Sequence, residues 1–174
     1  MQDTITWAST KSRIGVIRAA ATPRGVCRIA VGKETAQDFF SWLERHVGHA
    51  PRRPERSGLV GLALDQIAEY LEGKRREFDL PLDLRGTEFQ RKVWAAVAGI
   101  PYGQTRTYAE VARLIGKPQA VRAAGAANGA NPLPLVVPCH RVLGSDGSLT
   151  GYGGGLDVKC ELLEMEKRLG RPGV

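Results

Sequence analysis

The sequence lacks long apolar runs and a paired set of cysteines. No run approaches the roughly 18 apolar residues that a membrane-spanning helix needs, and the first residues have neither the basic start nor the apolar core of a signal peptide. The cysteines are odd in number and widely spaced, which excludes a disulfide framework: Cys27, Cys139 and Cys160. We therefore expect a cytoplasmic protein in a reducing setting, without membrane contact.

A cluster of metal ligands is missing as well. His46 and His49 lie three residues apart, and Cys27 is the cysteine in the same part of the chain. No convincing fourth ligand accompanies them, whereas a structural zinc site needs four. We predict no metal and no other cofactor.

The composition is that of a folded protein with an excess of positive charge. Of the 174 residues, 43% are hydrophobic and 25% are charged, which is ordinary for a soluble globular chain and argues against disorder. The formal net charge is +7. This charge favours a polyanionic partner, nucleic acid first, although it would also serve solubility alone.

The first part of the chain combines β-like runs with helices. Two β-like runs, at residues 14–17 and 26–31, flank a turn at Thr22–Gly25. Apolar residues recur at helical spacing in residues 35–47 and 59–71, so both stretches are predicted helices. Together they indicate a small α/β domain with a short antiparallel sheet, in which Cys27 is interpreted as a core residue.

The pattern changes near residue 85. Residues 78–81 resemble an edge strand, and after Arg85–Gly86 the sequence becomes mainly helical. We place a domain boundary there, between an N-terminal domain at residues 1–84 and a C-terminal domain at residues 85–174.

Two capping boxes open helices in the second domain. In Thr87–Gln90 and Thr107–Glu110, the threonine hydroxyl and the side chain three residues later can satisfy amides at a helix start. The helix after Thr107 ends at Gly116, and Pro118 suits the first turn of another helix. Two short helices joined by a tight turn are a helix-turn-helix candidate, although the same spacing fits a simple helical hairpin.

The second helix of this pair, residues 119–128, is rich in alanine and glycine. Its longer polar side chains are Gln119, Arg122 and Asn128, so it offers few groups to base edges. The small side chains allow close approach to another surface. If that surface is DNA, contacts with phosphates and with DNA shape should dominate over sequence readout; the alternative is tight packing inside the protein.

The strongest chemical signal lies in residues 131–142. The apolar residues 133–137 predict a short buried strand, stopped by Pro138. A thiol, an imidazole and a guanidinium follow at Cys139–Arg141. A cysteine beside two potential cations favours a low-pKa thiolate at a pocket floor. A structural cysteine beside a hydrogen-bonded histidine is the alternative that the pair alone leaves open.

The last part of the chain offers a glycine-rich loop and a helix with a buried stripe. The loop at Gly151–Gly155 can line a cleft, because glycine lets backbone amides approach a ligand. The helix carries Lys159, Leu162, Leu163 and Glu166 on one stripe. A carboxylate on a stripe with two leucines is expected to be partly buried and paired with a cation or a histidine.

Taken together, these motifs resemble the signature of the O6-alkylguanine-DNA alkyltransferases, also called methylated-DNA–protein-cysteine methyltransferases. The resemblance spans residues 85–168, whereas the first 80 residues resemble the family's ribonuclease-H-like α/β domain only loosely. The motifs that carry it, in chain order, are Arg85–Thr87, Phe89–Gln90, Val93–Trp94, Ile100–Gly103, Thr107–Tyr108, Ala120–Ala123, Asn131–Pro132, Pro138–Val142, Tyr152–Gly153 and Lys159–Glu166. It implies an α/β (α+β) fold in which a mainly helical C-terminal domain carries a helix-turn-helix and the active-site cysteine loop.

The resemblance implies a single transfer of an alkyl group from O6-alkylguanine, with O4-alkylthymine as a further candidate substrate. Cys139 resembles the acceptor, whose thiolate attacks the alkyl carbon and keeps the group as a thioether. His140 resembles the base that takes the thiol proton through a water, and Glu166 the carboxylate that orients it. Asn131 resembles a hinge asparagine, and Tyr108 a tyrosine that contacts the flipped nucleotide and can protonate the departing guanine.

The same resemblance implies a set of DNA contacts and a pocket. Arg122 resembles the arginine that fills the gap left by a base flipped out through the minor groove. The expected DNA-binding residues are Thr107, Tyr108, Gln119, Arg122, Ala123 and Asn128. The expected pocket residues are Pro134, Val142, Tyr152, Gly153 and Gly154. The implied partner is double-stranded DNA containing O6-alkylguanine, bound by a monomer for which cooperative assembly on DNA stays open.

One departure and three alternatives bear on this reading. Gly153 stands where some relatives have serine, and three consecutive glycines favour a wall that admits alkyl groups larger than methyl. An alkyltransferase-like protein that only recognises lesions would lack the acceptor, which is present here as Cys139. A sequence-specific regulator is disfavoured by the small side chains of residues 120–127, and a thiol hydrolase because a thioether does not hydrolyse as an acyl-thioester does.

Overall fold

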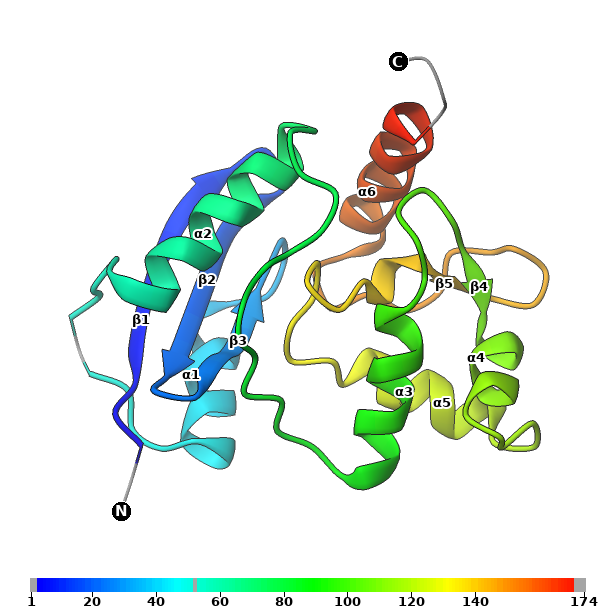
Figure 1. Cartoon of the computed structure of the whole chain (residues 1–174), viewed down its shortest axis with the longest axis horizontal. Coiled ribbons are helices and arrows are strands. Elements are labelled where there is room, and N and C mark those ends of the chain that lie inside the picture. The colour runs from blue at the N-terminus through cyan, green and yellow to red at the C-terminus, as the bar shows by residue number, and fades with distance from the viewer. Residues whose placement is uncertain (1–2, 52, 171–174) are drawn as a thin grey trace. The chain divides into compact units, whose positions relative to one another are not determined.

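The computed structural model describes residues 3–51 and 53–170 (Figure 1). The chain divides between Arg85 and Gly86 into two compact units. In the described part of the chain, no helix is both long enough and apolar enough to cross a membrane.

The first unit is built on a three-stranded antiparallel sheet in the order β1-β2-β3. Its strands are β1 (Thr6–Ser12), β2 (Gly15–Thr22) and β3 (Gly25–Ala30). The predicted turn at Thr22–Gly25 is confirmed, because these two residues close the β2–β3 hairpin. The pairing register shifts beside Ala20, where Cys27 is the extra residue of a β-bulge.

Two helices complete this unit (Figure 1). Helix α1 (Ala36–His46) packs on β3, and helix α2 (Gly58–Leu71) packs on all three strands. Both predicted helices are therefore confirmed to within two residues. Cys27 lies fully buried in one apolar cluster with Phe39 and Leu43 of α1, which confirms its interpretation as a core residue.

The predicted edge strand at residues 78–81 is wrong. The strand-like pairing of this segment is limited to an isolated parallel bridge between Leu82 and Val26. The Val26 amide donates to the Pro81 carbonyl at 2.8 Å. Pro81 has no amide hydrogen, so the ladder cannot extend backwards through it. Gly25 permits the close approach, because a Cβ at this position would lie 2.6 Å from the Pro81 oxygen.

The second unit is mainly helical, with one short parallel pairing. Figure 1 shows its elements in green to red. They are α3 (Glu88–Ala98), β4 (Arg106–Thr107), α4 (Tyr108–Leu114), α5 (Val121–Gly129), the single 3-10 turn η1 (Cys139–Arg141), β5 (Val142–Leu143) and α6 (Leu156–Leu169). Strands β4 and β5 pair in parallel, so the start of α4 lies beside the segment that follows η1.

Both predicted capping boxes are present at helix starts. The Thr87 amide donates to the Gln90 side chain at 2.9 Å, and the Gln90 amide donates to the Thr87 hydroxyl at 3.1 Å. The Thr107–Glu110 box opens α4 in the same way. The other boundaries differ: α3 already ends at Ala98, and α5 begins at Val121, because residues 117–120 form a separate turn that holds Pro118.

The predicted strand at residues 133–137 is also wrong, although the segment is largely buried. The chain turns back on itself, with the Val137 amide donating to the Leu133 carbonyl at 2.9 Å. Leu135 has a φ of 74°, which no strand residue adopts. Asn131 provides the missing polar partners: its side chain accepts from the Leu133 amide at 2.9 Å and donates to the Val137 carbonyl at 2.8 Å.

Replacement of Thr87 by alanine should lower the free energy of unfolding of the second unit by about 1 kcal/mol, because α3 loses its cap. Urea unfolding followed by circular dichroism measures the change. Thr87→Ser keeps the hydroxyl and should stay close to wild type. Equal losses in both variants would show that the cap does not stabilise α3.

Candidate active site

The site is built around η1, which packs against α3 and α6. Pro138, with φ −79° and ψ 64°, forms an inverse γ-turn in which the Cys139 amide donates to the Val137 carbonyl at 2.8 Å. This turn ends the apolar segment and starts the 3-10 turn. Cys139 is 7% exposed and His140 is fully buried. The turn therefore places a thiol and an imidazole inside the second unit without the strand that the sequence predicted.

Glu166 of α6 faces His140. The His140 Nε2 atom lies 2.8 Å from Glu166 Oε1, and the carboxylate is 1% exposed, which confirms the expectation of a buried, paired acid. Burial raises the pKa of Glu166, but hydrogen bonds from His140 and Arg141 outweigh it and hold this pKa well below its ordinary value. Since the carboxylate is charged, Nε2 carries the hydrogen, and Nδ1 is the ring nitrogen that can accept a proton.

Arg141 binds the same carboxylate, a role that the sequence did not suggest. Its Nε donates to Glu166 Oε2 at 2.8 Å, and its Nη2 donates to Oε1 at 2.7 Å. Its Nη1 donates to the Ile100 carbonyl at 2.7 Å, and its guanidinium lies 5.6 Å from the centre of the Tyr102 ring. The sequence signal that could have suggested this role was the position of Arg141, a basic residue directly after His140.

Gly103 is a further hydrogen-bond donor to Glu166. Its amide donates to Oε2 at 3.2 Å. The φ of Gly103 is 77°, a left-handed conformation that glycine adopts at little cost, and a Cβ there would lie 3.2 Å from the Glu166 carbonyl oxygen. The glycine of the Ile100–Gly103 motif thus allows the turn after α3 to reach the last helix.

The surroundings of the Cys139 thiol favour its protonated form. Burial raises its pKa, and a hydrogen bond with Asn131 and the positive charge of Lys159 offset part of this rise. The low-pKa thiolate expected from the sequence is therefore wrong for this state, because two neighbouring cations in a row of residues do not ensure a hydrated, electropositive site. For this thiol to act as a nucleophile, it would have to lose its proton to a base.

Lys159 is a second functional residue that the sequence reasoning did not single out, although it stood on the predicted stripe. It is fully buried, which lowers its pKa, and its Nζ donates to the Val142 carbonyl at 2.7 Å and to the Thr150 carbonyl at 2.9 Å. The Tyr108 hydroxyl also donates to the Thr150 carbonyl, at 3.2 Å. One carbonyl thus joins α6, the start of α4 and the loop before α6.

The expected pocket residues differ in burial. Pro134, Val142 and Gly154 are buried, whereas Gly153 is exposed. Tyr152 is partly buried, and burial raises the pKa of its hydroxyl well above the ordinary value. The pocket assignment stays a prediction; Tyr152 lies close enough to Cys139 and Glu166 for a negative charge on either residue to raise its pKa further.

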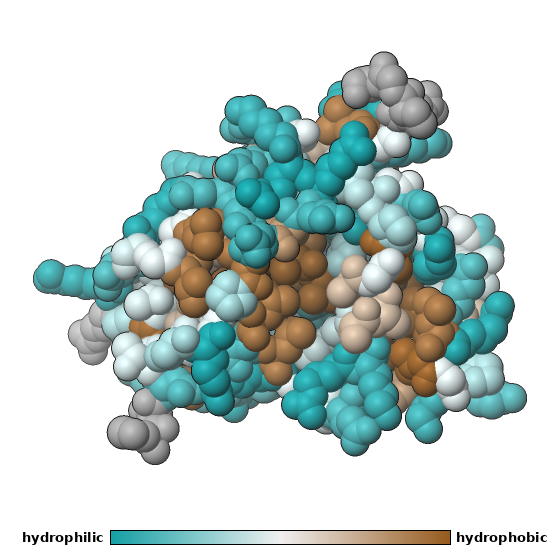
Figure 2. Space-filling view, viewed as in Figure 1, coloured by the Kyte–Doolittle hydropathy of each residue, from teal (hydrophilic) through white to brown (hydrophobic). Residues whose placement is uncertain are grey.

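Helices α4 and α5 and the turn between them form the predicted helix-turn-helix. Of the expected DNA-binding residues, Gln119, Arg122 and Ala123 are exposed on or before α5. Figure 2 shows apolar patches among hydrophilic residues on one face of the molecule. The large exposed apolar side chains of the described chain are Leu62, Leu114, Val121 and Leu156.

Asn128 and Thr107 differ from the exposed members of this set. Asn128 is buried, and its Nδ2 donates to the Cys139 carbonyl at 3.3 Å, so this side chain faces Cys139 and not the surface. The Thr107 hydroxyl caps α4 by accepting from the Glu110 amide at 3.2 Å. Tight packing, one of the two alternatives for the alanine-rich helix, applies to Ala124 and Ala127, whereas other positions of α5 face solvent.

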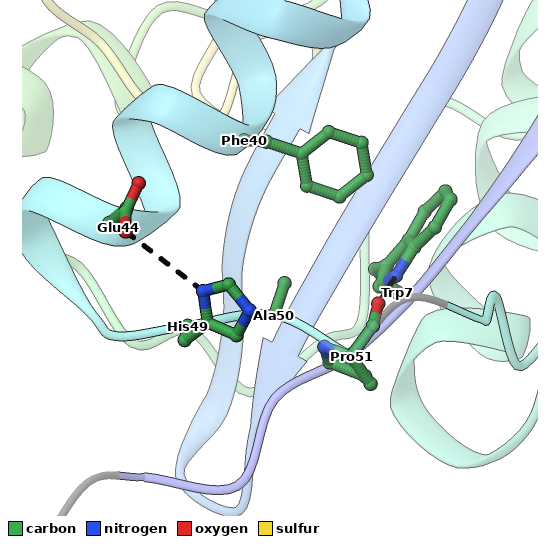
Figure 3. Close-up of a pocket in the computed structure, with 6 residues that line it drawn as sticks. All are labelled: Trp7, Phe40, Glu44, His49, Ala50 and Pro51. Carbon is green, nitrogen blue, oxygen red and sulfur yellow. Dashed lines mark hydrogen bonds and ion pairs between the residues drawn. The ribbon is translucent and has the colours of Figure 1, made fainter.

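A separate cavity of about 400 Å³ lies in the first unit (Figure 3). Its lining residues are Trp7, Phe40, Glu44, His49, Ala50 and Pro51. The His49 ring lies 3.9 Å from the Glu44 carboxylate, while the His46 ring is bonded to the Trp42 carbonyl at 2.9 Å. The described residues contain no group of three histidine, cysteine or acidic side chains that could hold a metal ion.

Comparison with known families covers both units. Residues 88–168 match the family described as 6-O-methylguanine DNA methyltransferase, DNA binding domain, and residues 5–84 match its ribonuclease-like domain. The chain belongs to the 6-O-methylguanine DNA methyltransferase family. It is thus one of the DNA-repair methyltransferases, and the match includes the first 80 residues, whose resemblance was loose in the sequence.

Curated family members support this assignment over most of the chain. The methylated-DNA–protein-cysteine methyltransferase of Methanosarcina barkeri is 55% identical over 90% of this chain and 94% of its own length. The inducible enzyme of Bacillus subtilis is 44% identical over 86% of this chain and 83% of its own. A Mycolicibacterium paratuberculosis member is 59% identical, but the alignment covers 61% of this chain and 64% of that protein.

Solved structures of family members share the fold. The Mycobacterium tuberculosis OGT in complex with DNA has a TM-score of 0.81 and 42% identity, and the match covers 94% of both chains. The O6-methylguanine-DNA methyltransferase of Pyrococcus kodakaraensis has a TM-score of 0.65 and 25% identity, with 94% of this chain and 99% of that chain covered.

The ion pairs of Glu166 should make the stability of this family member depend on pH. Because the folded state holds the pKa of Glu166 below its ordinary 4.5, the pairs contribute fully above about pH 4.5 and are lost as the pH falls through the folded-state pKa. Glu166→Gln should therefore lower the free energy of unfolding at pH 7 by about 3–5 kcal/mol, and by less as the pH approaches 2.

Urea unfolding of wild type and Glu166→Gln at a series of pH values measures this gap. Glu164→Gln, which replaces an exposed acid of the same helix, is the matched control and should show little change at any pH. A gap that stays constant from pH 7 to pH 2 would mean that folding does not lower the pKa of Glu166.

Proposed function

We propose that this chain repairs O6-alkylguanine in double-stranded DNA by a single transfer of the alkyl group to its own Cys139. The observation that carries the proposal is the buried row of Cys139, His140 and Glu166. A thiol adjoins an imidazole whose Nε2 hydrogen is held by a charged carboxylate at 2.8 Å. This is the nucleophile, base and orienting acid that covalent catalysis requires.

In the proposed reaction, His140 Nδ1 takes the Cys139 proton through a water molecule. The thiolate attacks the alkyl carbon, so that a carbon–sulfur bond forms while the carbon–O6 bond breaks. Tyr108 gives a proton to the departing guanine and regains one from solvent, and His140 returns its proton to solvent. Glu166 stabilises the imidazolium during the step. The thioether does not hydrolyse, so each molecule acts once.

The exposed part of the helix-turn-helix supports DNA as the partner. Arg122 is exposed on α5 beside Ala123, whose small side chain lets the helix approach the minor groove closely. Flipping a base out of the duplex costs a few kcal/mol. We infer that the Arg122 side chain offsets part of this cost by filling the gap, while the net charge of +7 supplies attraction to phosphates.

The loop that contains Gly153 and Gly154 supports a pocket wall that admits alkyl groups of different sizes. Gly153 is exposed, and a Cβ added there would meet nothing within 4 Å, so the wall has space beside it. Alkyl groups larger than methyl fit this arrangement. O4-alkylthymine offers the same alkyl–oxygen bond beside a ring nitrogen and is a further substrate to include in the assay.

Equimolar protein and duplex DNA containing O6-methylguanine should give one added methyl per protein, on the Cys139 peptide. Intact and peptide masses measure this transfer. Cys139→Ser should gain no mass, and Cys160→Ser, which removes a cysteine outside the site, should react like wild type. Repeated turnover, or DNA binding without any mass change, would defeat the proposal. A parallel duplex with O4-methylthymine defines the substrate range.

Arg122→Ala should slow repair of O6-methylguanine in duplex DNA by about tenfold or more, because the cost of base flipping is no longer offset. Its reaction with the free base O6-benzylguanine should change little, since no duplex is opened. Single-turnover rates with both substrates measure the difference. Arg168→Ala removes an exposed charge from α6 and serves as the control. Equal losses of Arg122→Ala on both substrates would rule out the gap-filling role.

A further inference from the structure

Arg141 and His140 both bind the buried carboxylate of Glu166. Arg141 donates to both oxygens of Glu166, at 2.7 and 2.8 Å, and His140 Nε2 lies 2.8 Å from Oε1. Arg141 and Glu166 are both buried. A guanidinium and a carboxylate that face each other in this two-point geometry form a pair with almost no net charge.

This neutralised pair changes what Glu166 can do to His140. A buried carboxylate that faced a histidine alone would strongly favour the imidazolium. Here the carboxylate still accepts the Nε2 hydrogen and sets the ring orientation, but most of its charge is already matched. The charged and titratable groups around His140 are Glu166, Arg141, Lys159, Cys139 and Tyr152. Burial, Arg141 and Lys159 hold the pKa of His140 below its ordinary value, although Glu166 raises it.

The position of Arg141 does not depend on Glu166 alone. Its Nη1 donates to the Ile100 carbonyl at 2.7 Å, and its guanidinium lies 5.6 Å from the centre of the Tyr102 ring. Contacts from the segment after α3 therefore keep the positive charge in place when His140 takes up a proton. The arginine acts on the base as a fixed charge.

We propose that Arg141 is a positioning residue that keeps His140 neutral, and Cys139 a thiol, until a damaged base occupies the site. The inference rests on the proposed function, in which Cys139 is consumed in one reaction. An imidazolium–thiolate pair that formed at rest would react with any small electrophile and waste the molecule. A neutral base avoids this loss and can still take the thiol proton when the substrate is in place.

The first test is the titration of His140, followed by NMR of the imidazole ring. His140→Asn identifies its signals against those of the exposed His46 and His49. In wild type, His140 should titrate below about 6.5, the ordinary value. In Arg141→Gln, which removes the charge but keeps a donor, the midpoint should rise by about one unit or more. Arg141→Lys keeps the charge and should lie closer to wild type.

The second test is the reaction of the thiols with iodoacetamide at pH 7, read from peptide masses. Cys139 of wild type should react slowly, and Arg141→Gln should raise its rate several-fold relative to Cys160 of the same molecule. Cys27 is the unreactive internal reference, because burial raises its pKa to about 12. Arg141→Lys should leave the Cys139 rate near that of wild type.

Neither test uses DNA, so both are independent of the test of methyl transfer. A wild-type His140 that titrates at or above its ordinary value overturns the inference, and this result does not depend on the Arg141 variants. A folded Arg141→Gln with unchanged His140 titration and unchanged Cys139 reactivity overturns it as well. Failure of methyl transfer to Cys139, with the expected titrations observed, would instead refute the proposed function.

Discussion

The buried carboxylate of Glu166 is the interaction on which the second unit depends. It joins α6 to η1 through His140 and Arg141, and to the turn after α3 through Gly103. A carboxylate at this depth is costly unless its oxygens receive donors, so these partners stabilise the fold of the second unit. Under the proposed function, the same side chain would couple the stability of the site to its reactivity.

Burial shifts the pKa values of Cys139 and His140. The Cys139 thiol and the His140 ring lie away from water, which disfavours their charged forms. Asn128 of α5 donates to the Cys139 carbonyl, so the helix with an exposed Arg122 also contacts the acceptor residue. A helix of small residues can do both, because its inner face packs closely while its outer face stays smooth.

Local patterns predicted much of the architecture. The capping boxes at Thr87 and Thr107, the helices of the first unit and the buried Glu166 each follow from contacts or periodicities within a few residues. The segment at residues 133–137 did not, because a short apolar run indicates burial and not the backbone conformation. There the side chain of Asn131 takes the place of a neighbouring strand. The Asn128 assignment failed for a related reason, since helix periodicity alone does not say which face packs inward.

The sequence by itself determined the family and the pairing of Glu166, and it predicted Cys139 as the acceptor, because these rest on residue types at characteristic spacings. The tertiary structure decided the electrostatic surroundings of the site. Arg141, Lys159 and Gly103 come from three separate segments, and their effect on His140 and Cys139 depends on distance and on the exclusion of water. Neither quantity is encoded in local spacing, so only the folded chain indicates in which direction the pKa values of Cys139 and His140 shift.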